Sequence, residues 1–161
     1  MNQNLEKKIS EILINKKLTI TAAESCTGGL VTSRLTDIPG SSAYIHQGLI
    51  VYSNDAKMKY LDVNEQTLKK HGAVSEEIAI EMAHGVLKNT DADIALSITG
   101  IAGPTGDKTE KPVGLVYICA ANAVNTKVKR FCGDNKLERT EMKRLFSDEA
   151  LKFLLEFLVS G

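Results

Sequence analysis

Hydrophobic positions along this chain switch between helical and strand-like spacing. Leu5, Ile9, Ile12 and Leu13 recur at intervals of three or four, which predicts an amphipathic helix over residues 4–16. The same spacing predicts further helices at 54–61, 65–71, 75–88 and 136–159. Runs rich in β-branched, aliphatic and aromatic residues predict strands at 18–23, 43–52, 94–98, 113–121 and 127–132.

The order of these elements predicts an α/β fold. Helices alternate with strands, and the last two strands flank a short polar turn at 122–125, which is typical of a β-hairpin. We therefore expect a three-layer helix/sheet/helix architecture, with a mixed, mainly parallel sheet that ends in an antiparallel hairpin. A length of 161 residues fits a single domain over 1–161.

The segment T-A-A-E-S-C-T-G-G, from Thr21 to Gly29, carries the strongest local signal. An apolar run stops there at small hydroxyl and glycine residues, and helical spacing resumes from Leu30, so Ser25, Cys26 and Thr27 are predicted to open a helix. The first N–H groups of a helix lack intrahelical partners and suit an oxyanion or a phosphate. The plainer alternative is an ordinary helix cap, which stabilises a helix by about 1 kcal/mol.

Two further polar loops follow predicted strands in the same way. They cover 52–57 and 99–104, and a polar stretch at 105–111, predicted to be a mobile excursion, comes after the second one. Because ligands of open α/β sheets gather at the carboxyl ends of the strands, the three loops predict one shared crevice.

Composition narrows the classes of function. Twenty basic and twenty acidic side chains give zero net charge, which disfavours a nucleic-acid-binding role. No apolar stretch approaches the ~20 residues that span a bilayer, and the N-terminus lacks a signal-peptide core, so a cytoplasmic protein without membrane contact is expected. Three cysteines without a C-x-x-C pair and three dispersed histidines predict neither a metal site nor a cofactor.

Six stretches together resemble the CinA C-terminal domain family, the PncC-type nicotinamide mononucleotide deamidases. They are TAAESCTGG, IPGSSAY with GLIVYSNDAK, HGAVSEE, SITGIAGPTG, KPVGLVY and FCGDNKLER, and they span about residues 19–144. The resemblance implies hydrolysis of the carboxamide of nicotinamide mononucleotide to nicotinate mononucleotide and ammonia. Members with a second, N-terminal pyrophosphatase-like domain are longer, so we expect a stand-alone form of the domain.

Hydrolysis of an unactivated amide needs a nucleophile, a proton donor for ammonia and fixed donors for the oxyanion. Ser25 is the predicted nucleophile, and Lys57, which resembles the family's lysine in Y-S-N-x-x-K, is the predicted proton-transfer partner. That role requires the pKa of Lys57 to fall from about 10.4 toward 7. Tyr52 is expected to orient the pair or relay the proton. Cys26 remains an alternative nucleophile, because a thiol at a helix N-terminus is acidified.

The binding candidates are hydroxyl, N–H and cationic groups. The N–H groups of 26–28 are oxyanion candidates, and Arg139, which resembles the family's arginine after Gly-Asp, is expected to contact a phosphate or carboxyl group. The full set of predicted substrate-binding residues is Cys26, Thr27, Gly28, Gly29, Ser41, Ser42, Thr99, Gly100 and Arg139. The chain departs from the family pattern at Asn135, where many members have another arginine, and Lys136 could substitute as a point charge.

A second hypothesis from a different class stays open. The name of the family comes from competence-associated proteins, so the chain could be a non-catalytic nucleotide-binding or partner-binding module. In either case the resemblance implies a homo-oligomer, since members of the family commonly pair.

Overall fold

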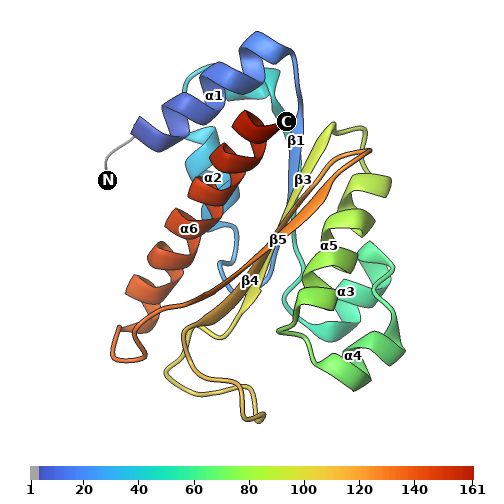
Figure 1. The fold of residues 1–161 in the computed structure, drawn as a ribbon, viewed down its shortest axis with the longest axis vertical. Helices are drawn as coiled ribbons and strands as arrows, with labels where there is room; N and C mark the ends of the chain where they lie inside the picture. The colour runs from blue at the N-terminus through green and yellow to red at the C-terminus, as the bar shows by residue number, and fades with distance from the viewer. Residues whose placement is uncertain (1–3) are drawn as a thin grey trace.

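The computed structural model describes residues 4–161 and has the alternating order of helices and strands that the sequence predicts (Figure 1). The elements, in chain order, are α1 (Asn4–Lys16), β1 (Ile20–Glu24), α2 (Leu30–Thr36), the short 3-10 helix η1 (Ser41–Ala43), β2 (Ile45–Ile50), α3 (Asn54–Leu61), α4 (Glu65–His71), α5 (Glu76–Lys88), β3 (Ile94–Gly100), β4 (Leu115–Ala121), β5 (Thr126–Cys132) and α6 (Arg139–Ser160).

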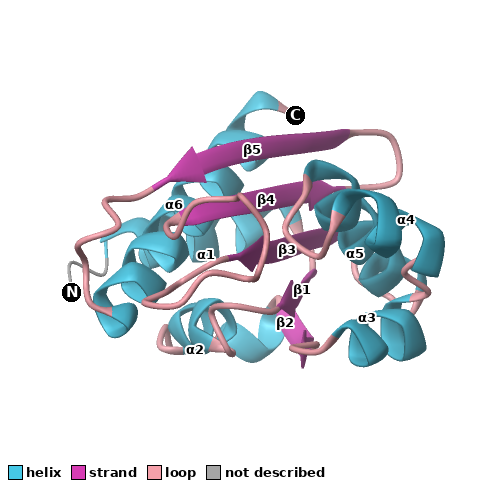
Figure 2. Ribbon diagram, turned by 90° about the horizontal axis from the view of Figure 1, so that it is seen from below, coloured by secondary structure: helices cyan, strands magenta, loops and turns pink. Residues whose placement is uncertain are grey.

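The five strands form one mixed sheet in the order β2-β1-β3-β4-β5 (Figure 2). β1 pairs in parallel with both β2 and β3, whereas β4 is antiparallel to both β3 and β5. Four strands therefore point the same way and only β4 is reversed. The predicted mixed, mainly parallel sheet with a terminal hairpin is confirmed, and the hairpin turn closes with a hydrogen bond from Asn122 N–H to the Asn125 carbonyl.

Helices cover both faces of the sheet and give the predicted three layers (Figures 1 and 2). The helices α1, α2 and α6 bury side chains such as Ile9, Phe146 and Leu154 on one face. On the other face α5 packs Met82 and Val86 into a second core, which α3 and α4 complete. Burying a large apolar side chain contributes about 1.5–3 kcal/mol, so the two cores fix the sheet between the helical layers.

Helix boundaries follow local capping chemistry in most places. The side chains of Ser53, Asn64 and Ser75 each accept a backbone N–H at the start of α3, α4 and α5. Two predicted starts are wrong. The helix α2 begins at Leu30 rather than at Ser25, Cys26 and Thr27, which lie in a bend and turn, and α6 begins at Arg139 rather than at 136. None of the helices within 4–161 combines the length and apolar character required to cross a bilayer.

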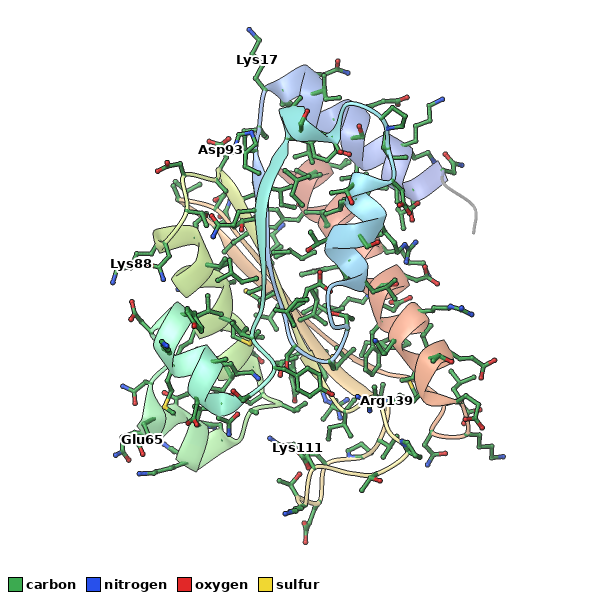
Figure 3. The ribbon with its side chains drawn as sticks, turned by 180° about the vertical axis from the view of Figure 1, so that it is seen from behind. Lys17, Glu65, Lys88, Asp93, Lys111 and Arg139 are labelled. Carbon is green, nitrogen blue, oxygen red and sulfur yellow. The ribbon has the colours of Figure 1, made fainter. Side chains whose placement is uncertain are left out.

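The topology brings distant segments to one edge of the sheet. The strands β1, β2 and β3 end there at Glu24, Ile50 and Gly100, and β5 ends there as well, shortly before α6 begins. Figure 3 shows the labelled residues Arg139 and Lys111 at this end of the molecule, with Lys17 and Asp93 at the opposite end. The three loops that the sequence singles out therefore start from a common edge.

Candidate active site

A cleft of about 220 Å³ opens at the carboxyl edge of the sheet, between the ends of β1, β2 and β3. Its walls come from five regions: the turn after β1, the segment from Tyr52 into the first turn of α3, the segment between α4 and α5, the loop that follows β3 and the first residue of α6. The lining residues are Ser25, Cys26, Tyr52, Asn54, Lys57, Ala73, Val74, Thr99, Gly100, Ile101, Ala102, Gly103, Thr105, Gly106, Asp107 and Arg139. The shared crevice predicted from the three loops is thus present.

Ser25 and Lys57 meet at the base of this cleft. The Nζ of Lys57 lies 3.0 Å from the Oγ of Ser25, and only 1% of Lys57 and 8% of Ser25 is exposed. Lys57 lies in the first turns of α3, whose start is fixed by the Ser53 cap, and its Nζ also donates to the carbonyls of Val51 and Tyr52, both at 3.0 Å. These two carbonyls therefore hold the Lys57 amine next to the Ser25 hydroxyl.

Burial lowers the pKa of Lys57 from 10.5 to about 8, because the ammonium loses hydration that the cleft does not replace. A neutral amine has two N–H donors and one lone pair. If the two N–H groups remain on the carbonyls of Val51 and Tyr52, the lone pair faces the hydroxyl of Ser25. The pair is thus arranged for a proton to pass from Ser25 to Lys57.

The pKa of Cys26 is shifted upward, whereas that of Lys57 is shifted downward. Its side chain is buried, and desolvation raises the pKa of the thiol to about 12. The expectation that a helix N-terminus acidifies this thiol is wrong, because α2 begins four residues later and burial outweighs the positive charges of Lys57 and Arg139. The thiol therefore stays protonated at neutral pH, whereas Ser25 has a base beside it.

Tyr52 and Arg139 form the outer wall of the cleft. One guanidinium nitrogen of Arg139 donates to the Tyr52 hydroxyl at 2.6 Å, and another donates to the carbonyl of Gly103 at 2.5 Å. The phenol is 58% exposed, and within 4–161 its hydroxyl has no hydrogen bond to Ser25 or Lys57. A direct relay through the phenol is therefore not the geometry found. Tyr52 contacts Lys57 through its carbonyl, which orients the amine.

The side chain of Glu24 organises the turn after Ser25. The fully buried carboxylate of Glu24 accepts the N–H groups of Gly29, Val31 and Thr32 and the hydroxyl of Thr27. The start of α2 therefore already holds an anion, so the N–H groups of Gly29, Val31 and Thr32 are not open to a substrate.

Three predicted binding residues consequently lie beside the cleft rather than in it. Thr27, Gly28 and Gly29 line a neighbouring hollow of about 370 Å³, together with Lys143 and Arg144 of α6. The hydroxyl of Thr27 donates to Glu24, and the N–H of Gly28 donates to the Ser25 carbonyl.

Ser41 and Ser42 are the predicted binding residues that the fold moves farthest away. They lie in η1, just before Ile45, and Ile45 pairs with Ile20 at the beginning of β1. Ser25 follows the other end of β1, so the two serines belong to the opposite edge of the sheet. The fold of the single chain does not bring them to this cleft, because parallel pairing of β2 with β1 separates the start of one strand from the end of the other.

Thr99 and Gly100 do line the cleft, but Thr99 does not offer its hydroxyl. That hydroxyl donates to the carbonyl of Ala73 at 2.8 Å and ties β3 to the segment before α5. Lys111 donates to the carbonyls of His71 and Val74, so the same segment is held from both sides. The predicted polar excursion at 105–111 is thus anchored at its end over the cleft.

Three of the residues that line the cleft, Asn54, Val74 and Asp107, were not among the predicted site residues. Asn54 begins α3 directly after the Ser53 cap, Val74 enters from the segment before α5, and Asp107 comes from the polar excursion. Asn54 could have been found, since it belongs to the same Y-S-N-x-x-K stretch as Lys57. Val74 is an apolar residue without reactive or hydrogen-bonding side-chain atoms, and it reaches the cleft because of how α4 and α5 pack.

Over residues 4–161, His, Cys, Asp and Glu side chains nowhere gather in threes as they would around a metal ion. The groups that carry the chemistry proposed below are the Ser25 hydroxyl, the Lys57 amine of lowered pKa, the Arg139 guanidinium and backbone N–H groups, and the side chains of Cys26, Tyr52, Asn54 and Asp107 also line the cleft.

Comparison with known proteins agrees with this fold and these motifs. The family model described as the CinA C-terminal domain matches residues 2–158. A CinA-like protein of Chloroherpeton thalassium is 51% identical over 156 residues, which are 96% of this chain and 37% of that protein. A competence-damage inducible protein of Caldicellulosiruptor saccharolyticus is 49% identical over 161 residues, or 99% of this chain and 38% of its own length. The chain thus spans less than two-fifths of these curated relatives.

Solved structures show the same fold. The competence/damage inducible protein CihA of Agrobacterium tumefaciens has a TM-score of 0.92 at 39% identity, with 96% of this chain and 93% of that chain covered. The CinA superfamily protein KP700603 of Klebsiella pneumoniae has a TM-score of 0.95 at 30% identity, covering 99% and 98%. With the motifs, the fold and the family match in agreement, this chain belongs to the CinA C-terminal domain family.

Proposed function

We propose that this protein hydrolyses the carboxamide of nicotinamide mononucleotide to nicotinate mononucleotide and ammonia by a Ser-Lys mechanism. The observation that carries the proposal is the 3.0 Å contact between Ser25 Oγ and the buried Nζ of Lys57, whose pKa of about 8 leaves a usable neutral fraction near neutral pH. An activated hydroxyl in a sheltered cleft fits acyl transfer, and amide hydrolysis is the acyl transfer that the family resemblance implies.

In the first half-reaction, neutral Lys57 takes the proton of Ser25 while Oγ attacks the carboxamide carbon. The carbonyl oxygen becomes an oxyanion, for which the N–H of Cys26, directly after the nucleophile and on the cleft wall, is the nearest backbone donor in sequence. Lys57 then gives its proton to the amide nitrogen, the C–N bond breaks and ammonia leaves. The nicotinoyl group remains on Ser25 as an ester.

In the second half-reaction, Lys57 is neutral again and removes a proton from water. The hydroxide attacks the ester carbon, the C–O bond to Ser25 breaks, and Lys57 returns the proton to Oγ. The products are the restored hydroxyl and a carboxylic acid, which gives its proton to water or to the released ammonia and becomes the nicotinate carboxylate, so one water is consumed for each ammonia released.

Arg139 is the proposed contact for an anionic group of the substrate. It is a cation on the wall of the cleft, and its planar guanidinium matches the oxygen pairs of phosphates and carboxylates. Its hydrogen bonds to the Tyr52 hydroxyl and the Gly103 carbonyl hold the guanidinium group at the rim of the cleft. Asn54, at the start of α3, adds an amide that could bond a ribose hydroxyl.

Ammonia release from nicotinamide mononucleotide tests the mechanism. Ser25→Ala and Lys57→Met should each lower kcat by at least 10³-fold, because they remove the proposed nucleophile and the amine that contacts it. The matched controls are Ser42→Ala, an exposed serine at the opposite edge of the sheet, and Lys59→Met, an exposed lysine two residues along the same helix. Both controls should keep the native rate.

The outcomes separate the two functional hypotheses. Full activity in Ser25→Ala would remove the mechanism. If the native protein releases no ammonia but its melting temperature rises with the mononucleotide, a non-catalytic binding module is the correct class.

A further inference from the structure

Glu24 carries an arrangement that the mechanism above does not use. It is the last residue of β1 and immediately precedes Ser25, yet its side chain is completely buried. Its main-chain carbonyl accepts the N–H of Val51 at 2.8 Å, and the carbonyl of Val51 in turn accepts Nζ of Lys57. The backbone of this one residue thus connects the strand that leads to the serine with the segment that holds the lysine.

The carboxylate of Glu24 is fully engaged within the turn that follows Ser25. Oε2 accepts the Thr27 hydroxyl at 2.6 Å and the N–H groups of Gly29 and Val31, each at 3.1 Å. Oε1 accepts both the N–H and the hydroxyl of Thr32 at 2.7 Å. Both oxygens are saturated by donors from 27–32, so that segment is wrapped around the carboxylate.

This arrangement replaces an ordinary helix cap. The residue at the N-cap position of α2 is Gly29, which has no side chain to cap the helix, and Glu24 reaches forward from the preceding strand instead. Five hydrogen bonds are more than one helix cap requires. Their common effect is to fix the turn in which Gly28 N–H donates to the Ser25 carbonyl, and with it the direction of the Ser25 side chain.

We propose that Glu24 is a positioning residue for the reaction: its buried carboxylate takes the place of a bound anion at the start of α2 and thereby holds Ser25 Oγ in contact with Lys57. This inference rests on the proposed role of Ser25 as nucleophile. It also assigns the phosphate of the substrate to a different part of the site, since the donors of this helix start are already occupied.

The substitution Glu24→Gln keeps the size of the side chain but not its chemistry. A carboxamide has one acceptor oxygen and one NH2 group, and both ends of the Glu24 side chain face backbone N–H donors. Either orientation sets an NH2 group against a backbone N–H, so the turn must shift. Because displacements of about 1 Å can cost 10²-fold in rate, kcat should fall by about 10²-fold, while KM should stay within threefold.

Glu6→Gln is the matched control. Glu6 is also a buried carboxylate, with 3% exposure, but it lies on α1 and accepts from Arg34 rather than from the turn after Ser25. Both variants should lower the melting temperature, and circular dichroism at the assay temperature establishes that both are folded. Only Glu24→Gln should lose kcat per folded molecule. An equal loss in the two variants would show a merely structural role and overturn the proposal.

Labelling with an alkyl fluorophosphonate makes the test independent of the substrate. Ser25 Oγ attacks phosphorus, fluoride leaves, and the serine proton passes to Lys57, so the labelling rate reports the alignment of the Ser25 hydroxyl with Lys57 without any contribution from substrate binding. We expect Glu24→Gln to label about 10²-fold more slowly than the native protein and Glu6→Gln to label at the native rate.

The two failures can be told apart. Native labelling without ammonia release would reject nicotinamide mononucleotide as substrate and leave the Glu24 comparison intact. Equal labelling of native protein and Glu24→Gln, or no labelling of native Ser25, would overturn the positioning role.

Discussion

At the scale of single residues, the burial of Lys57 has the largest consequence for the proposed reaction, because it lowers the pKa of the amine. A lysine with 1% exposure has lost the water that normally stabilises its charge, and three acceptors around Nζ only partly replace it. Cys26, one residue from the nucleophile, is shifted by the same burial in the direction that makes it inert. The same burial thus increases the neutral fraction of the Lys57 amine and decreases the thiolate fraction of Cys26.

The pH dependence of the reaction follows from the sign of that shift. Because Lys57 acts as a base only when neutral, kcat/KM for ammonia release should rise with pH, with an apparent pKa of about 8, and level off above it. The measurement is a pH–rate profile from pH 6 to 9.5 at constant ionic strength. A rate that is flat or falls across this range contradicts a lysine base.

At the scale of elements, α6 joins the active site to the core. Its first residue, Arg139, lies at the cleft because β5 ends at the carboxyl edge, whereas residues farther along the helix, such as Phe146, are buried against the sheet. The same helix therefore anchors the cation that we assign to the substrate. Lys111 fixes the opposite rim by its two bonds to the segment before α5.

Replacing Arg139 tests the contribution of this helix start. Arg139→Gln should raise KM for nicotinamide mononucleotide by about 10-fold or more, and Arg139→Lys should restore only part of the affinity, since an ammonium cannot make the two-pronged contacts of a guanidinium. Steady-state kinetics measure both variants. Arg130→Gln on β5 removes an exposed arginine elsewhere and should leave KM unchanged. An unaltered KM in Arg139→Gln excludes a contact with the substrate anion.

At the scale of the whole molecule, the sheet between two helical layers is what shields the cleft base. The two hydrophobic cores lie on opposite faces of the sheet, and Arg34 ties α1, α2 and α6 together through Glu6, Ser147 and Asp148. The cost of this shielding is that folding must bury the amine of Lys57. The oligomeric state stays a prediction from the resemblance.

That cost should appear in the pH dependence of global stability. The folded-state pKa of Lys57, about 8, lies below its ordinary value of 10.5, so the unfolded chain binds the proton more tightly and stability rises with pH between these values. Relative to Lys57→Met, the native protein should gain about 2–3 kcal/mol in free energy of unfolding between pH 7 and pH 10. Urea denaturation at both pH values measures it, and parallel changes in the two proteins contradict a buried amine.

From the sequence alone we could predict the type and order of the elements and the three polar loops that meet at one edge of the sheet. These features depend on local periodicity and on the general placement of ligands in α/β sheets, and the resemblance added the pairing of Ser25 with Lys57. It also indicated Arg139, which the fold brings to the cleft.

The contacts of the polar side chains, in contrast, depend on how the elements pack and are not visible in local sequence patterns. Ser41 and Ser42 lie away from the cleft because strand direction, not distance along the chain, sets which loops meet. Tyr52 contacts Arg139 although 87 positions separate them in the sequence. The role of Glu24 escaped prediction because capping rules look for short polar residues at the helix start, not for a carboxylate from the preceding strand. Burial sets the pKa of Lys57, and burial exists only when all three layers are packed.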